Sequence, residues 1–167
     1  MDNLLHNISR DLIFFHPVWA HLTHVEIKLD QQNAFLHLLQ LGPNLSSLSI
    51  HMPYGSSLIQ AFKLVTHNSL QSLRITLTDN LQMRYQMPHL FNTLSLPNLR
   101  VLEACGFHTW PHEELKTFLA RSNCPLESLI FGASEGMTTD QWRAEYIPLI
   151  PSLRVEVLVG VDSMHHG

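Results

Sequence analysis

The sequence predicts an α/β fold, a right-handed solenoid of about six strand–helix repeats whose strands form one curved parallel sheet on the concave face. Two observations predict it: short leucine-led segments recur along the chain, and segments with helical spacing lie between them. The leading leucines are Leu22, Leu45, Leu70, Leu99, Leu126 and Leu153. They are separated by 23, 25, 29, 27 and 27 residues, which fits the interval of roughly 20–29 residues that is typical of leucine-rich repeats.

Each leucine-led segment has the alternating apolar pattern of a short strand. The second reads Leu45-x-x-Leu48-x-Ile50, and the sixth, which starts at Leu153, is slipped by one residue. Because strand side chains alternate, the apolar positions face a core and the residues between them face outward. A single strand of this kind cannot bury its apolar side, so we expect the repeats to stack. The position eight after each leading leucine holds no asparagine, which indicates irregular repeats.

The first two intervals predict helices. Residues 33–41 are mostly apolar and end at Gly42 and Pro43, which is typical of a helix end. The second interval opens with Ser56 and Ser57, either of which can cap a helix. The apolar residues that follow approximate helical spacing; they are Leu58, Ile59, Phe62 and Val65.

The later intervals predict shorter or better-marked helices. Pro88 interrupts residues 81–94, so we expect two short pieces there. A helix that opens at residues 111–114 has two acidic residues in its first turn, which suit the helix dipole, and turns Leu115, Phe118 and Leu119 inward. Residues 138–140 precede the last helical pattern, which carries Trp142, Tyr146, Ile147 and Ile150.

The chain of 167 residues suits one domain, which at this size buries about 70% of the surface of its unfolded form. We divide residues 1–167 into an N-terminal capping helix (1–18), the repeats (19–159) and a polar tail (160–167). The capping stripe is formed by Leu5, Ile8, Leu12 and Phe15. After residue 159 no apolar stripe follows, so we expect the sixth strand to be an exposed edge that is prone to self-pairing.

Several classes of function are excluded. No stretch has the roughly 18 apolar residues of a membrane helix, and no signal peptide opens the chain, so we expect a cytoplasmic or nuclear protein. Charged residues make up 14% and the net charge is −4, which argues against nucleic-acid binding. No phosphate loop, serine elbow or zinc-protease motif is present. We therefore predict no enzyme, no cofactor and no small-molecule substrate.

The 12 histidines raise the question of a metal site. The one cluster of interest contains Cys105, His108, His112 and Cys124. Neither cysteine has a second cysteine two to four residues away, as a structural zinc site requires. We therefore interpret His108 and His112 as loop residues that face solvent and predict no metal.

Three phrases carry a family resemblance: residues 96–102 (LPNLRVL), 118–129 (FLARSNCPLESL) and 150–153 (IPSL). Residues 96–158 resemble the leucine-rich-repeat region of the F-box-like proteins of mushroom-forming fungi. The resemblance implies that such a chain recognises target proteins for a ubiquitin ligase, while the F-box recruits a Skp-type adaptor. Residues 1–21 are too short for an F-box and lack its opening motif. The resemblance therefore implies the recognition half only.

The functional prediction falls on the concave face, which the outward strand positions line in such solenoids. The central position of each strand gives six candidate binding residues: Glu26, Ser49, Arg74, Glu103, Ile130 and Glu156. The three glutamates favour a protein partner with basic residues. Val101, Ile130 and Leu158 predict an apolar patch, which is typical of a contact site; the alternative is that the sixth strand or the chain end covers them. Two functions remain open: recognition of ubiquitin-ligase substrates, or a free-standing structural or scaffolding repeat protein.

Overall fold

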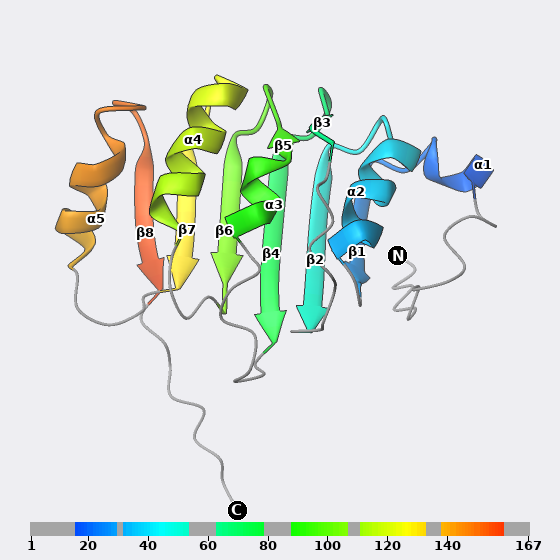
Figure 1. The fold of residues 1–167 in the computed structure, drawn as a ribbon, viewed down its shortest axis with the longest axis horizontal. Coiled ribbons are helices and arrows are strands. Elements are labelled where there is room, and N and C mark those ends of the chain that lie inside the picture. Colours follow the sequence, from blue (N-terminus) through cyan, green and yellow to red (C-terminus); the bar gives the residue numbers. More distant parts are fainter. Residues whose placement is uncertain are drawn as a thin grey trace, which may run out of the picture.

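The computed structural model describes residues 16–29, 32–53, 63–78, 88–106, 111–132 and 138–158. Their centre is a parallel sheet of six strands that follow one another in chain order (Figure 1). The strands are β1 (His24–Lys28), β2 (Ser47–Pro53), β4 (Ser72–Thr78), β6 (Val101–Cys105), β7 (Ser128–Gly132) and β8 (Arg154–Leu158). Each leucine-led segment has thus become one strand. The α/β class and the parallel sheet are confirmed.

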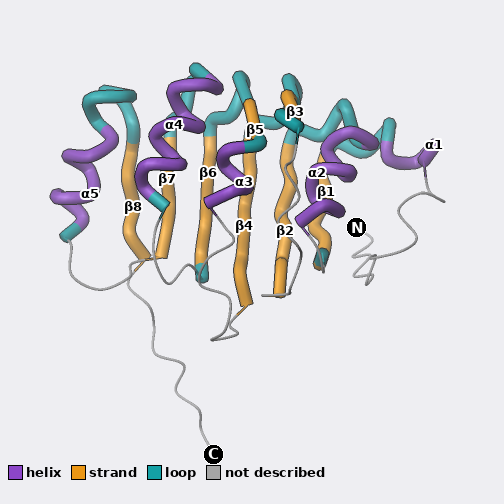
Figure 2. The backbone as a smooth tube through the Cα atoms, in the orientation of Figure 1, coloured by secondary structure: helices purple, strands orange, loops and turns teal. Residues whose placement is uncertain are grey.

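Five helices are described: α1 (His16–Trp19), α2 (Gln32–Leu41), α3 (Pro88–Asn92), α4 (His112–Ser122) and α5 (Thr139–Tyr146). Figures 1 and 2 show α2, α3 and α4 in front of the main sheet and α5 at its β8 end. The buried side chains of all four belong to one core. No described helix covers the opposite face of the sheet, which we call the open face.

The core lies between the helices and the inward side of the sheet. In β6 and β7 buried residues alternate with half-buried ones, as the period of two predicts. Apolar side chains of the strands meet those of the helices in a single cluster. Its fully buried members include Phe35, Leu48, Ile75, Leu102, Phe118, Phe131 and Tyr146. The strands and helices are therefore held together mainly by the burial of apolar area.

Helix α4 forms as predicted. Its first turn carries Glu113 and Glu114, and Leu115, Phe118 and Leu119 are buried. Asn123 ends the helix in the left-handed conformation and donates its main-chain N–H to Leu119. Asparagine tolerates this conformation better than most residues, which explains why the helix stops there.

Helix α5 begins with a capping box, in which Thr138 and Gln141 bond reciprocally through side chain and main chain. Trp142 and Tyr146 are buried. Ile147, which belongs to the same predicted helical pattern, is 37% exposed. The helix ends at Tyr146, so Ile147 lies in the following turn, where its side chain no longer shares the buried face.

The second interval differs from the prediction at Val65. This residue does not extend a helix: Val65–Thr66 forms β3, which pairs in parallel with β5 (Leu94–Ser95). Main-chain bonds from Val65 N to Thr93 O and from His67 N to Ser95 O fix this two-stranded sheet. The rest of the predicted helix, residues 56–62, lies outside the described residues. Of the two pieces expected in 81–94, α3 starts at Pro88, a residue that suits the first turn of a helix.

Main-chain bonds repeat from one strand to the next. The oxygen of Thr23 accepts from both Ser46 N and Ser47 N, at 2.8 and 3.0 Å. The equivalent oxygens of Ser46, Gln71 and Arg100 each accept two bonds in the same way. The slip of the sixth segment is confirmed by the register of β7 and β8. Ser128, two residues after Leu126, pairs with Arg154, which is only one residue after Leu153.

Strand β8 ends the main sheet, so the prediction of an edge strand holds within the described chain. Its self-pairing stays a prediction. The capping helix predicted over 1–18 lies outside the described residues except for part of α1, and the tail 160–167 lies wholly outside them. None of the described helices has the length and apolarity that crossing a membrane requires.

Candidate binding surface on the open face

The sheet register brings the six candidate residues into a single row across the open face. Glu26 pairs with Ser49, Ser49 with Arg74, and Arg74 with Glu103. Glu103 then pairs with Ile130, and Ile130 with Glu156. We call this set the central row. Its alignment follows from the shared spacing of the strands, whereas its use in binding stays a prediction.

An ion pair occupies the middle of the central row. Arg74 donates its Nε–H to Glu103 Oε2 at 2.8 Å, with 57% of the arginine side chain and 20% of the glutamate side chain exposed. Sequence reasoning treated the two residues as separate contacts. Because Arg74 neutralises Glu103, an approaching protein meets this pair as one polar unit with little net charge.

The other two glutamates of the row lie at its ends. Glu26 Oε1 is 3.1 Å from Nε2 of His51 on the neighbouring strand. Glu156 is exposed, and Arg154 lies two residues earlier on the same side of β8. The attraction for a basic partner is therefore greatest at Glu156, because Glu103 is paired with Arg74 and Glu26 contacts His51.

Ser49 contributes a buried hydroxyl to the row. Its Oγ is buried and has no hydrogen-bond partner among the described residues. A buried hydroxyl without a partner costs free energy, of the order of 1–3 kcal/mol. A protein on the open face would reach the exposed neighbours of Ser49 before its hydroxyl.

The three apolar residues predicted as a patch form a diagonal. Val101 lies on β6, Ile130 one strand over and two residues further along, and Leu158 one strand and two residues beyond that. With strands about 4.8 Å apart and a rise of about 3.3 Å per residue, successive members are about 8 Å apart. Leu158 is 45% exposed and the other two are half-buried. We call this diagonal the apolar stripe.

The two cysteines behave as small apolar side chains. Cys105 is half-buried at the end of β6, and burial, with a smaller effect of Glu103, raises the pKa of its thiol. Burial likewise raises the pKa of Cys124. A protonated thiol is a weak nucleophile and a weak metal ligand. Among the described residues no three His, Cys, Asp or Glu side chains are grouped to hold a metal, and His108 lies outside them.

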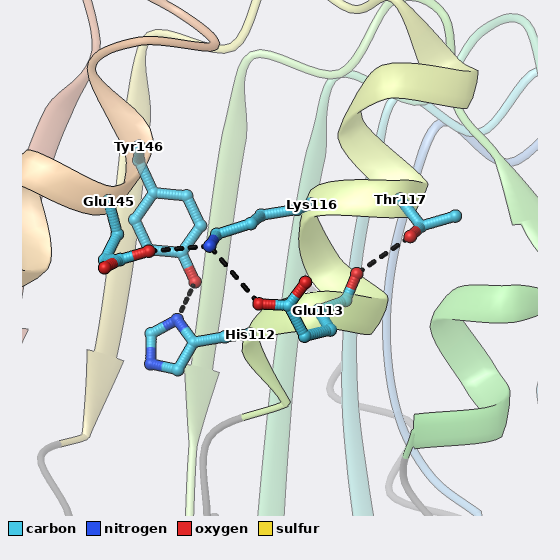
Figure 3. Close-up of polar contacts among 6 residues, drawn as sticks. All are labelled: His112, Glu113, Lys116, Thr117, Glu145 and Tyr146. Carbon is cyan, nitrogen blue, oxygen red and sulfur yellow. Dashed lines mark hydrogen bonds and ion pairs between the residues drawn. The ribbon is translucent and has the colours of Figure 1, made fainter.

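A second polar cluster joins α4 to α5 (Figure 3). His112 Nδ1 lies 2.7 Å from the hydroxyl oxygen of Tyr146, and the His112 ring stacks on Trp142 with a centroid separation of 3.9 Å. Lys116 donates to Glu145 at 2.6 Å and to Glu113 at 3.4 Å. Sequence reasoning missed this cluster, and its interpretation of His112 as a solvent-facing loop residue is wrong, because His112 is the first residue of α4 and its ring packs on Trp142.

One signal for the cluster was available in the sequence. His112 and Lys116 are four residues apart, and residues at that spacing share a face of a helix. Burial lowers the pKa of His112, partly against the opposing effect of Glu145. Stacking and bonding between two helices position α5 on the core, so we assign these residues a structural role.

Comparison of the chain with protein-family models, with curated proteins and with solved structures gives no match in any of the three. The functional argument therefore rests on the described geometry and on the sequence itself.

Proposed function

We propose that the chain is a leucine-rich-repeat solenoid that binds another protein on its open face. One observation carries the proposal: the helices cover one side of the sheet, while the other side presents an aligned row of polar, charged and apolar residues. Such extended surfaces are how repeat proteins recognise their partners. The similar intervals of 23 to 29 residues between leading leucines support the solenoid, as do the paired main-chain hydrogen bonds that repeat from one strand to the next.

Within this function, the chain serves as the substrate-recognition part of an F-box-like ubiquitin-ligase adaptor. The resemblance of residues 96–158 to that family supports this step. The stretch covers β6, α4, β7, α5 and β8, which include the whole apolar stripe. A free-standing scaffold with no ubiquitin link would use the same surface, so the adaptor test separates the two functions.

The open face is tested by substitution. Ile130→Asp places a charge on the apolar stripe, and Arg74→Ala removes the cation of the central ion pair. Both side chains lie outside the core, so circular dichroism should be unchanged. Affinity capture from fungal extract, quantified by mass spectrometry, should show proteins that the wild type retains and both variants lose.

Matched controls lie on the exposed side of α5. Ala144→Asp adds a carboxylate and Arg143→Ala removes an ion-paired arginine away from the open face, and both positions are exposed. They should retain every partner. If all four variants retain the same proteins, the open face is not the binding surface.

A second experiment tests the link to ubiquitin. Purified Skp-type adaptor should not bind the 167-residue chain directly, and it should be captured when an F-box is fused to the N-terminus. Ubiquitination of a captured partner that depends on this fusion would support substrate recognition. Capture of partners without any such ubiquitination would favour the scaffold.

A further inference from the structure

Gly132 leaves a gap in the side-chain layer of the open face. It is the last residue of β7, and its strand partner is Leu158 on β8. Among the described residues, a Cβ placed there would meet one atom within 4 Å, the main-chain nitrogen of Gly106 at 3.9 Å. The fold therefore has room for a larger residue at this position.

The backbone does not require glycine here either. Among the described glycines only Gly106 has a positive φ, at 85°. At Gly42 the need is steric, because a Cβ would lie 2.7 Å from the Leu45 side chain. Glycine in a strand weakens it and often marks a bulge, a tight bend, or a place where a ligand or another backbone approaches closely. Gly132 fits the last of these, because neither conformation nor packing accounts for it.

Apolar side chains surround the gap. Ile130 lies two residues earlier on the same side of β7, and Leu158 lies beside Gly132 on β8. The β6–β7 register ends at the pair Ala104–Phe131, so the next residue of β6, Cys105, lies opposite Gly132 on the β6 side. The thiol pKa of Cys105 is raised by burial, so this neighbour is uncharged at neutral pH. The gap therefore lies at the end of the apolar stripe and has apolar neighbours on three sides.

The charges nearby define the partner further. Glu103, on the β6 side, is already paired with Arg74. Glu156, on the β8 side, is exposed and has no ion pair among the described residues. A cation that approaches from the partner would therefore gain more from Glu156 than from Glu103.

We propose that a protein segment bound on the open face inserts an aliphatic or aromatic side chain over Gly132, and that an adjacent lysine or arginine of the segment pairs with Glu156. The inference deepens the proposed function and rests on it. Anchoring side chains in small apolar recesses are the usual source of binding energy at protein interfaces.

The test uses random peptides displayed on phage as the probe and the full 167-residue chain as the target. Selected peptides should share an apolar residue next to lysine or arginine. Gly132→Val should weaken their binding by about tenfold or more, since it fills the gap that receives the anchor. Gly132→Ala should have a smaller effect in the same direction. Glu156→Gln should weaken binding and remove the preference for a basic residue.

Controls separate the gap from the rest of the face. Ser72→Val adds similar bulk at an outward position of β4, and Glu26→Gln removes a carboxylate at the far end of the central row. Both should bind the peptides as the wild type does. Thermal melting of Gly132→Ala and Gly132→Val should occur at the wild-type temperature or above it, because glycine weakens a strand and the β-branched valine suits one.

Hydrogen exchange of the peptide complexes distinguishes failure of the anchor at Gly132 from failure of the proposed open-face function. If the peptides protect β6–β8 but Gly132→Val binds them normally, the anchor is wrong and the proposed surface stands. If the selected peptides protect no strand of the main sheet, both the anchor and the open-face function fail.

Discussion

Asn98, just before β6, donates a side-chain hydrogen bond of 2.6 Å to the main-chain oxygen of Asn68, just before β4. Asn44 makes the same 2.6 Å bond to Ala20. Each donor follows a proline and directly precedes a leading leucine, and each acceptor lies two residues before one. At two places along the sheet, such a hydrogen bond therefore fixes the start of one strand against the start of the next.

We predict that Asn98→Asp destabilises the fold by about 1–2 kcal/mol. The change keeps the shape of the side chain but replaces the donor with an oxygen that repels the Asn68 carbonyl. Chemical denaturation measures the loss. Gln71→Glu adds a charge at an exposed position nearby and should change stability by less than about 0.5 kcal/mol. Equal effects of the two substitutions would show that charge, not the lost bond, is responsible.

Gly106→Ala is expected to be severely destabilising, by more than about 3 kcal/mol. The residue has a φ of 85°, and an added Cβ would lie 2.1 Å from the main-chain oxygen of Leu77. Main-chain atoms cannot yield as a flexible side chain does. Soluble yield and the midpoint of thermal unfolding measure the effect, with Gly132→Ala as the tolerated control; normal stability of Gly106→Ala would refute the reported backbone approach.

Arg121 is expected to stabilise the junction between α3 and α4. Its guanidinium donates to the main-chain oxygens of Phe91 and Leu94, the latter from Nε at 2.9 Å. Arg121→Lys should cost about 2 kcal/mol, because a single ammonium group cannot reproduce the fork. Urea denaturation measures it. Arg143→Ala, in an exposed pair with Asp140, should cost less than about 0.5 kcal/mol.

His112 makes stability depend on pH. Burial lowers its pKa from the ordinary value of 6.5, so the unfolded chain binds the proton more readily than the folded one. Its contribution is therefore complete above about pH 6.5 and is lost progressively as the pH falls below that value. Melting temperatures at about pH 7.5 and 5.5 should differ less in His112→Gln than in the wild type. The control His37→Gln, at an exposed position of α2, should retain the wild-type difference.

The six strands and the central row could be predicted because both depend on local periodicity. A leading leucine fixes where a strand begins, and alternation then assigns each side chain to a face. Even the slip at Leu153 is visible in the spacing of its valines. The strand β3 gives no such signal, because its two residues bond to a partner that lies 29 residues away.

Side-chain contacts between different strands or helices could not be predicted in the same way. The Arg74–Glu103 ion pair depends on side-chain rotamers that form only when β4 and β6 are paired. The contact of His112 with Tyr146 depends on how α4 and α5 sit over the core. Alternation places Gly132 on the outward side of β7, but its neighbours were needed to show that, among the described residues, only the main-chain nitrogen of Gly106 would lie within 4 Å of a Cβ there.

The main-chain hydrogen bonds that link successive strands have a consequence for the order in which the protein unfolds. The oxygens of Thr23, Ser46, Gln71 and Arg100 each hold the next strand entrance by two bonds, whereas Glu127 O holds β8 through the single N–H of Arg154. In such an array each strand is held mainly by the strands next to it. Its opening should begin at β8 and proceed inward, so the amides of that strand are expected to exchange with solvent first.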